Sequence, residues 1–268
     1  MSQITIIPLY LLAASAFAMG RLPRFDEQSR PYFLVAIAFA AVGVALHAQN
    51  LFALMLPGEG FDLSIGSAAS MIGLELALIA LIASIEPTLR GMSAGMLLLS
   101  AATAWLMGPS TDPGSGLAMA WQVRAHILIA LLSYGLLTVG AIVAIYAVIQ
   151  ERRLHLARFT AVNRLFAPLE TTEKLLIGIT GAGFAGLTLS IASGLSFVED
   201  LVEQHLAHKF ALSLLAWIVF GILLAGRFFA GWRGKRAVKL YLWGFATLCL
   251  AYFGSRVILQ EIFGQSWH

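Results

Sequence analysis

The feature that most constrains this chain is a succession of eight apolar segments, each long enough to cross a lipid bilayer. A helix needs about 20 mostly apolar residues to cross the hydrocarbon, where lipid offers no hydrogen bonds to an unpaired backbone. The segments lie approximately at residues 3–20, 31–56, 64–85, 91–107, 118–150, 173–196, 208–230 and 237–262. We therefore expect an all-α integral membrane protein, a polytopic bundle of about eight transmembrane helices that forms a single membrane domain over residues 1–268.

Composition excludes the soluble classes of protein. Hydrophobic residues make up 59% of the chain and charged residues 12%, whereas soluble domains have about 45–50% and about 25%. So little polar surface excludes a cytosolic enzyme, a secreted disulfide scaffold and a disordered chain. The single cysteine, Cys249, has no partner for a disulfide.

The distribution of basic residues predicts the orientation in the membrane. Connections that are rich in Lys and Arg stay in the cytoplasm. Most of the 17 basic residues follow the first, third, fifth and seventh apolar segments: Arg21, Arg24, Arg30, Arg90, Arg152, Arg153, Arg158, Arg164, Lys174, Arg227, Arg233, Lys235, Arg236 and Lys239. We expect these connections to be cytoplasmic and both termini to be extracytoplasmic. The net charge of +3 thus reflects topology and not nucleic-acid binding.

Two stretches of these connections are also candidate docking surfaces. From Arg152 to Phe166, apolar and basic residues alternate at roughly helical spacing, which predicts a short interfacial helix on the anionic inner leaflet. The basic loops 151–174 and 227–239 are the candidate surfaces for a protein partner in the membrane.

A glycine-rich motif in the sixth apolar segment predicts helix packing. Residues 181–186 match the GxGxxG dinucleotide fingerprint, which functions only between a strand and a helix. Inside an apolar helix, Gly178, Ala182 and Gly186 instead form the small-xxx-small pattern of close packing in lipid.

Histidines gather at one predicted level of the membrane, on the extracytoplasmic side. His47, His126 and His208 each lie near an outer segment end, and imidazole is a good axial ligand for heme iron. The alternative is that each histidine makes a hydrogen bond between helices.

Three further residues at that outer level could contact a heme. Arg124 and Arg256 suit its propionates, because guanidinium pairs well with carboxylate. Trp121 lies beside them, although an aromatic belt at the membrane interface is the alternative for this residue.

One acidic residue, Glu75, falls near the middle of an apolar segment, where a charge is expensive. It suggests a small-ion path or a protonated hydrogen-bond partner. The sequence offers no nucleophile–base pair, so we expect no catalytic residues and no enzyme activity of its own.

Several motifs resemble those of a known family. They are Trp217-Ile218-Val219-Phe220, the run Gly231-Trp232-Arg233-Gly234-Lys235-Arg236-Ala237, Gly244-Phe245, Ala251-Tyr252-Phe253-Gly254, and the segments 121–126, 134–135 and 150–152. The chain is similar to cytochrome c assembly proteins, the CcsA/CcmC-type heme handlers, and most to the small YpjD-type inner-membrane proteins.

The resemblance implies heme binding at the outer face of a bacterial inner membrane, with His126 in the place of an external histidine. The family's tryptophan-rich external segment is replaced here by residues 203–209, without a tryptophan. This departure indicates an accessory protein of cytochrome c biogenesis and not a complete heme-delivery machine. The alternatives are a cofactor-free regulatory or partner-binding subunit, and a small-ion transport component that uses Glu75.

Overall fold

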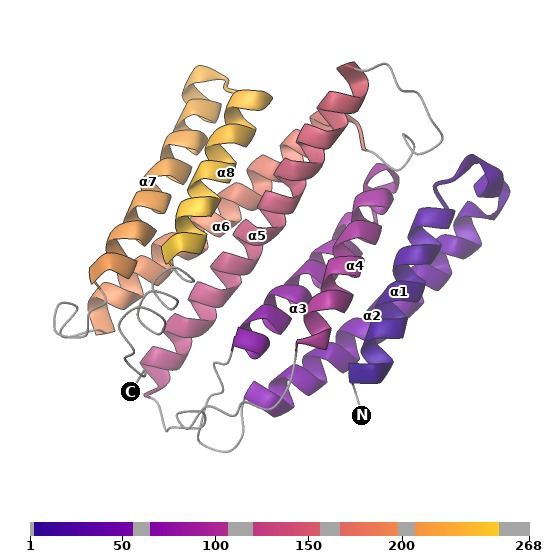
Figure 1. Cartoon of the computed structure of the whole chain (residues 1–268), viewed down its shortest axis with the longest axis horizontal. Helices are drawn as coiled ribbons and strands as arrows, with labels where there is room; N and C mark the ends of the chain where they lie inside the picture. Colours follow the sequence, from indigo (N-terminus) through magenta and orange to yellow (C-terminus); the bar gives the residue numbers. More distant parts are fainter. Residues whose placement is uncertain (1–2, 56–64, 107–119, 156–166, 198–206, 252–268) are drawn as a thin grey trace. The chain divides into compact units, whose positions relative to one another are not determined.

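The computed structural model describes residues 3–55, 65–106, 120–155, 167–197 and 207–251, and these form eight α-helices and two short 3-10 helices (Figure 1). The first four helices are α1 (Gln3–Met19), α2 (Ser29–Met55), α3 (Ile65–Ala83) and α4 (Arg90–Trp105). The last four are α5 (Trp121–His155), α6 (Leu169–Phe197), α7 (Ala207–Ala230) and α8 (Lys235–Cys249). The 3-10 helices η1 (Pro23–Gln28) and η2 (Pro87–Leu89) precede α2 and α4.

Each helix coincides with one predicted apolar segment, so the all-helical fold class is confirmed. Five helices, α2, α3, α5, α6 and α7, are long and apolar enough to cross a membrane. Helix α5 has 35 residues, about 52 Å at 1.5 Å per residue, which exceeds a hydrocarbon core of about 30 Å. Helix α5 is therefore longer than the apolar layer is thick.

The chain divides into two compact units. Unit 1 comprises Met1–Met119 with Gln150–Thr172, and unit 2 comprises Ala120–Ile149 with Glu173–His268. Unit 1 thus holds α1 to α4, whereas unit 2 holds most of α5 and α6 together with α7 and α8. The single membrane domain over residues 1–268 stays a prediction.

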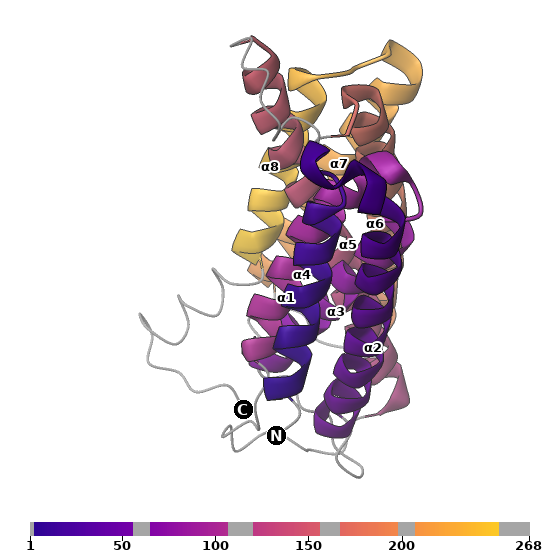
Figure 2. The same cartoon turned by 90° about the vertical axis from the view of Figure 1, so that its right-hand side faces the viewer.

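Unit 1 is a bundle in which α1 contacts α2 and α4, and α3 contacts α2 and α4 (Figure 2). Small residues allow these helices to approach closely. A Cβ atom at Gly43 would meet the Tyr10 ring at 2.9 Å, and one at Gly73 would overlap Thr103. The connections α1–α2 and α3–α4 meet at one end, where the guanidinium of Arg90 lies 3.8 Å from the centroid of the Phe33 ring.

Unit 2 is held together by polar contacts between its helices. Ser133 on α5 donates to the carbonyl oxygen of Gly183 on α6 at 2.8 Å. The buried Tyr241 hydroxyl on α8 donates to the carbonyl oxygen of Leu137 on α5 at 2.7 Å. Trp217 of α7 stacks on Phe184 of α6 with a centroid separation of 5.4 Å. Each of these contacts links a side chain to a neighbouring helix. Together they hold α5, α6, α7 and α8 in fixed positions along one another.

The prediction that Gly178, Ala182 and Gly186 form the packing face of α6 is wrong for the first two of these residues. Gly178 and Ala182 are exposed, and a Cβ atom at Gly178 would meet nothing within 4 Å. Gly183 and Gly186 instead pack against α5, since Cβ atoms there would meet Leu137 at 2.7 Å and Ser133 at 3.1 Å. The bond from Ser133 to Gly183 selects this face. The motif at residues 181–186 lies inside α6, as expected for a packing motif and not for a nucleotide loop.

Part of the predicted interfacial helix belongs to α5, which continues through Arg152 and Arg153 to His155. Residues 156–166 lie outside the described residues. A hydrogen bond nevertheless joins the two ends of the α5–α6 connection, because the Gln150 side chain donates to the carbonyl oxygen of Ala167.

Candidate functional site

His126 lies in the second turn of α5 and contacts the last turns of α6. Its Nδ1 lies 2.8 Å from the hydroxyl oxygen of Ser193. The ring is only partly buried. Because Ser193 precedes the end of α6 at Phe197 by four residues, the pair lies at the end of unit 2 where α5 begins and α6 ends.

The serine fixes the tautomer of this histidine. The Ser193 hydroxyl has a single proton, which it donates to the carbonyl oxygen of Ser190 at 3.0 Å. Ser193 Oγ therefore accepts the bond from the Nδ1–H group of His126. In the neutral ring this leaves the lone pair on Nε2. That is the form in which imidazole coordinates a metal, with its other nitrogen held by an outer hydrogen bond.

A glycine provides the space for the His126 ring. A Cβ atom at Gly194 would lie 3.2 Å from Cε1 of His126 and 3.8 Å from both ring nitrogens. Any larger residue would therefore press on the edge of the ring that joins the two nitrogens. The cradle of Ser193 and Gly194 thus holds His126 in one orientation.

Of the four other candidate residues of unit 2, three lie in the described helices. Arg124 lies one half-turn before His126 in α5 and is partly buried, and Trp121, the first residue of α5, is 72% exposed. His208 is the second residue of α7, which begins at the same end of unit 2. Arg256 lies outside the described residues.

His47 lies in unit 1 and is fully buried between three helices. Its Nε2 lies 2.7 Å from Ser70 Oγ on α3, and its Nδ1 lies 3.1 Å from the Tyr10 hydroxyl on α1. Both ring nitrogens are therefore occupied, and the side chain has no exposed surface. As an iron ligand, His47 would first have to lose one of these bonds.

Sequence reasoning identified His126 but missed Ser193 and Gly194. A signal existed, because Ser190 and Ser193 are three residues apart in α6, near the level predicted for the outer histidines. The pairing of Ser193 with His126 spans 67 residues. No short motif reveals a contact over that separation.

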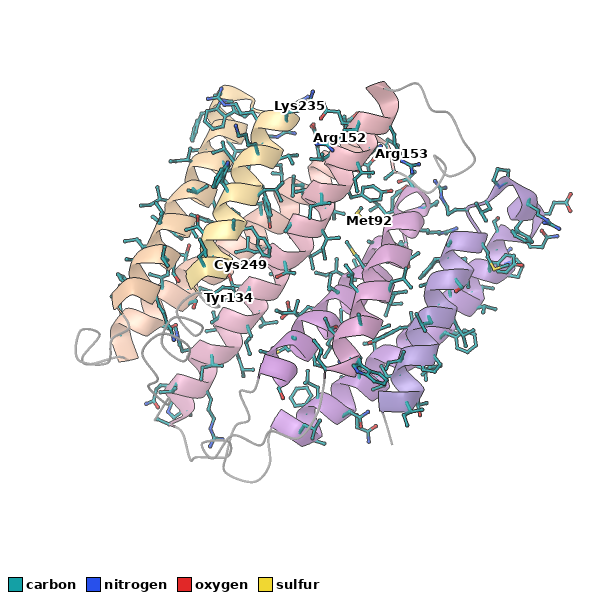
Figure 3. The ribbon with its side chains drawn as sticks, in the orientation of Figure 1. Met92, Tyr134, Arg152, Arg153, Lys235 and Cys249 are labelled. Atoms are coloured by element: carbon teal, nitrogen blue, oxygen red, sulfur yellow. The ribbon has the colours of Figure 1, made fainter. Side chains whose placement is uncertain are left out.

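The opposite end of unit 2 contains a well-ordered turn between α7 and α8. Gly231 and Gly234 have φ angles of +64° and +60°, which side chains with a Cβ atom rarely adopt. The Gly234 amide donates to Oε1 of Glu173 at 2.9 Å, and the guanidinium of Arg236 lies 3.8 Å from the centroid of the Trp232 ring. Figure 3 shows Lys235 at this end of α8 and Cys249 at the other end.

This turn explains the run Gly231–Ala237 in structural terms. Gly226 on α7 leaves room for Trp232, because a Cβ atom there would overlap the indole ring. The amide of Trp232 donates to the carbonyl oxygen of Gly226 at 3.0 Å, and Arg227 donates to the carbonyl oxygen of Trp232 at 3.2 Å. The glycines, the tryptophan and the arginines of this region thus form a fixed reversal of the chain.

The helices and their apolar lengths define a multi-pass helical membrane protein. A family model described as "Cytochrome C assembly protein" matches residues 34–263. The chain belongs to the cytochrome c assembly protein family, as its motifs indicated, and is a membrane protein related to cytochrome c biogenesis.

Known relatives agree with this assignment. The chain is 29% identical over 264 residues to the inner membrane protein YpjD of Escherichia coli, covering 94% of this chain and 98% of that protein. It is 31% identical over 144 residues to an uncharacterized 28.8 kDa protein of Azospirillum brasilense, covering 53% of each. It is 26% identical over 159 residues to the cytochrome c biogenesis protein CcsA of Guillardia theta, covering 53% of each. No solved structure matches the chain.

Proposed function

We propose that this protein binds heme at the end of unit 2 where α5 begins, with His126 as an iron ligand, and acts as an accessory heme handler in cytochrome c biogenesis. The observation that carries the proposal is the bond from His126 Nδ1 to Ser193, which in the neutral ring places the lone pair on Nε2. When bound, heme would supply an iron that accepts an imidazole nitrogen as a ligand.

The residues around His126 fit such a group. Ser193 and Gly194 orient the imidazole, so that little rotational freedom is lost when Nε2 coordinates. Arg124 and the exposed ring of Trp121 lie in the first two turns of α5, and they are our candidates to pair with a propionate and to lie against a porphyrin edge. His208 and Arg256 remain candidates for the second ligand and the second propionate.

The fit of His47 is poorer. Its two nitrogens already bond to Tyr10 and Ser70 in a fully buried position. We therefore assign His47 to the packing of unit 1 unless the Ser70 bond opens, and we assign the primary ligand to His126.

The orientation of the chain determines which compartment the site faces. The basic connections predict that the α1–α2, α3–α4 and α7–α8 ends are cytoplasmic. The His126 end of unit 2 then faces the outside, where c-type cytochromes receive heme. The basic loops 151–174 and 227–239 remain available on the inner side for a protein partner.

The experiment is a hemin titration of the purified chain in mild detergent, followed by its Soret absorption. We expect saturable binding by the wild type and at least a tenfold loss of affinity in His126→Ala. His155→Ala, which removes a histidine at the other end of α5, is the matched control and should bind like the wild type. Wild-type affinity in His126→Ala would refute the proposal. A colourless protein that co-purifies with a stoichiometric partner would favour a cofactor-free regulatory subunit.

A further inference from the structure

The proposed heme site does not use the most deeply placed carboxyl group of unit 1. Glu75 lies near the middle of α3, a helix that is long and apolar enough to cross a membrane. Its side chain is 7% exposed. Both carboxyl oxygens are buried, and neither has a hydrogen-bond partner among the described residues.

No cation of α1, α2 or α4 is bonded to Glu75. The charged and titratable side chains of α1, α2 and α4 are Tyr10, Arg30, Tyr32, His47 and Arg90. Arg30, Tyr32 and Arg90 belong to the first turns of α2 and α4, at the end where Arg90 lies over Phe33. Tyr10 bonds to His47, and His47 also bonds to Ser70. An ionised, uncompensated carboxylate in such a place costs several kcal/mol, so the neutral acid is favoured.

A purely structural role does not account for Glu75 either. Two buried serines of α4 show how a polar side chain is satisfied here: Ser93 donates to the carbonyl oxygen of Leu89, and Ser100 to that of Met96. A carboxyl group kept for hydrogen bonding between helices would have a partner, because an unpaired buried polar group is destabilising. Within the part of the chain that the structure describes, no hydrogen bond explains why an acid occupies this position.

We propose that Glu75 is a proton-binding site in the membrane-spanning part of α3. Its carboxyl group is held as the neutral acid and exchanges its proton with water. The ligand is the proton alone, so the site requires no heme. It belongs to unit 1, whereas the proposed heme site belongs to unit 2.

Infrared spectroscopy of the heme-free chain in lipid vesicles tests this directly. We expect the wild type to show the carbonyl-stretch band of a protonated carboxyl group near neutral pH. The band should shift after exchange into D2O and should be lost in Glu75→Gln. In Glu86→Gln, which alters an exposed carboxylate bonded to Thr88, the band should remain. Absence of the band from the wild type, or a band that does not shift in D2O, would overturn the proposal.

Labelling with a hydrophobic carbodiimide provides a second measurement if Glu75→Gln does not fold. The protonated carboxyl group adds across a C=N bond of the reagent: a C–O bond forms and the proton moves to nitrogen. Acyl transfer to nitrogen then gives a stable acylurea, without a leaving group or redox change. Mass spectrometry should find the label at Glu75 in the wild type and at the shortened side chain in Glu75→Asp. An unlabelled Glu75 in folded wild-type protein would contradict the inference. Since no heme is present, either result is independent of the heme proposal.

Discussion

His47 and His126 differ in the hydrogen bonds that their ring nitrogens make. His47 uses both nitrogens, one for Tyr10 and one for Ser70. His126 bonds through Nδ1 to Ser193. Because only an unoccupied nitrogen coordinates a metal without breaking an existing bond, His126 is suited to be a ligand and His47 is suited to join helices.

Removal of the serine hydroxyl tests whether Ser193 positions His126. We predict that Ser193→Ala lowers hemin affinity by about 10- to 100-fold, the usual effect of deleting a hydrogen bond behind a metal-binding histidine. It should also alter the Soret spectrum, whereas Ser193→Thr should restore both. Ser196→Ala is the matched control, because that exposed hydroxyl bonds only within α6. Equal affinity and spectra in Ser193→Ala and Ser196→Ala would show that Ser193 has no positioning role.

Deletion of the His47 ring tests its packing role. His47→Ala leaves the hydroxyl groups of Tyr10 and Ser70 without their partner and opens a cavity between α1, α2 and α3. We predict a loss of about 3 kcal/mol or more in the free energy of unfolding, measured by denaturant titration in mixed micelles. Ser15→Ala, at an exposed hydroxyl that bonds to the carbonyl oxygen of Leu11, should change stability little. Unchanged stability together with lost hemin binding would instead make His47 a ligand.

At the scale of elements, the α7–α8 turn depends on backbone angles that only glycine adopts easily. Gly234 combines φ +60° with ψ −139°, and its amide bonds to Glu173 on α6. The turn therefore connects three helices at the end of unit 2 opposite His126.

Substitution of Gly234 measures this dependence. We predict that Gly234→Ala lowers the free energy of unfolding by about 1–3 kcal/mol, because the alanine is forced into a strained region. Gly178→Ala is the control: it lies within α6 with open space around it, where alanine is neutral or stabilising by about 0.5–1 kcal/mol. Thermal unfolding in detergent compares them. Equal midpoints would contradict the strain.

The sequence predicted the existence of the helices better than their ends and faces. Apolar length located all eight, but it ended the fifth segment at residue 150 and began the sixth at 173, whereas α5 ends at His155 and α6 begins at Leu169. Helices continue beyond the hydrocarbon, where polar residues are solvated and apolarity carries no signal. The face of α6 depends on the Ser133–Gly183 bond, a long-range contact that the glycine spacing alone does not specify.

At the scale of the whole molecule, each unit has basic residues gathered at one of its ends. In unit 1, η1 and the start of α4 supply Arg24 and Arg90, and in unit 2 the α7–α8 turn supplies Arg233 and Lys235. The site at His126 lies at the opposite end of unit 2. This asymmetry was visible in the sequence because it depends only on residue order. The bonding of His47 and His126 was not, since their partners are distant in the chain.

Accessibility of single cysteines tests the predicted orientation. In a Cys249→Ser background, we predict that Ala120→Cys reacts with a membrane-impermeant maleimide in cells with an opened outer membrane and an intact inner membrane. Lys235→Cys should react only after the inner membrane is disrupted. Both positions are exposed in the structure. The reverse pattern would invert the topology and place the His126 end in the cytoplasm.

The central claim, that the His126 imidazole is an iron ligand, is tested most directly by chemical rescue. His126→Gly should lose the spectrum of histidine-ligated heme, and free imidazole should restore it by entering the space that the side chain leaves. His155→Gly, altered at the far end of α5, should keep the wild-type spectrum and should not respond to imidazole. A wild-type spectrum in His126→Gly without imidazole would contradict the claim.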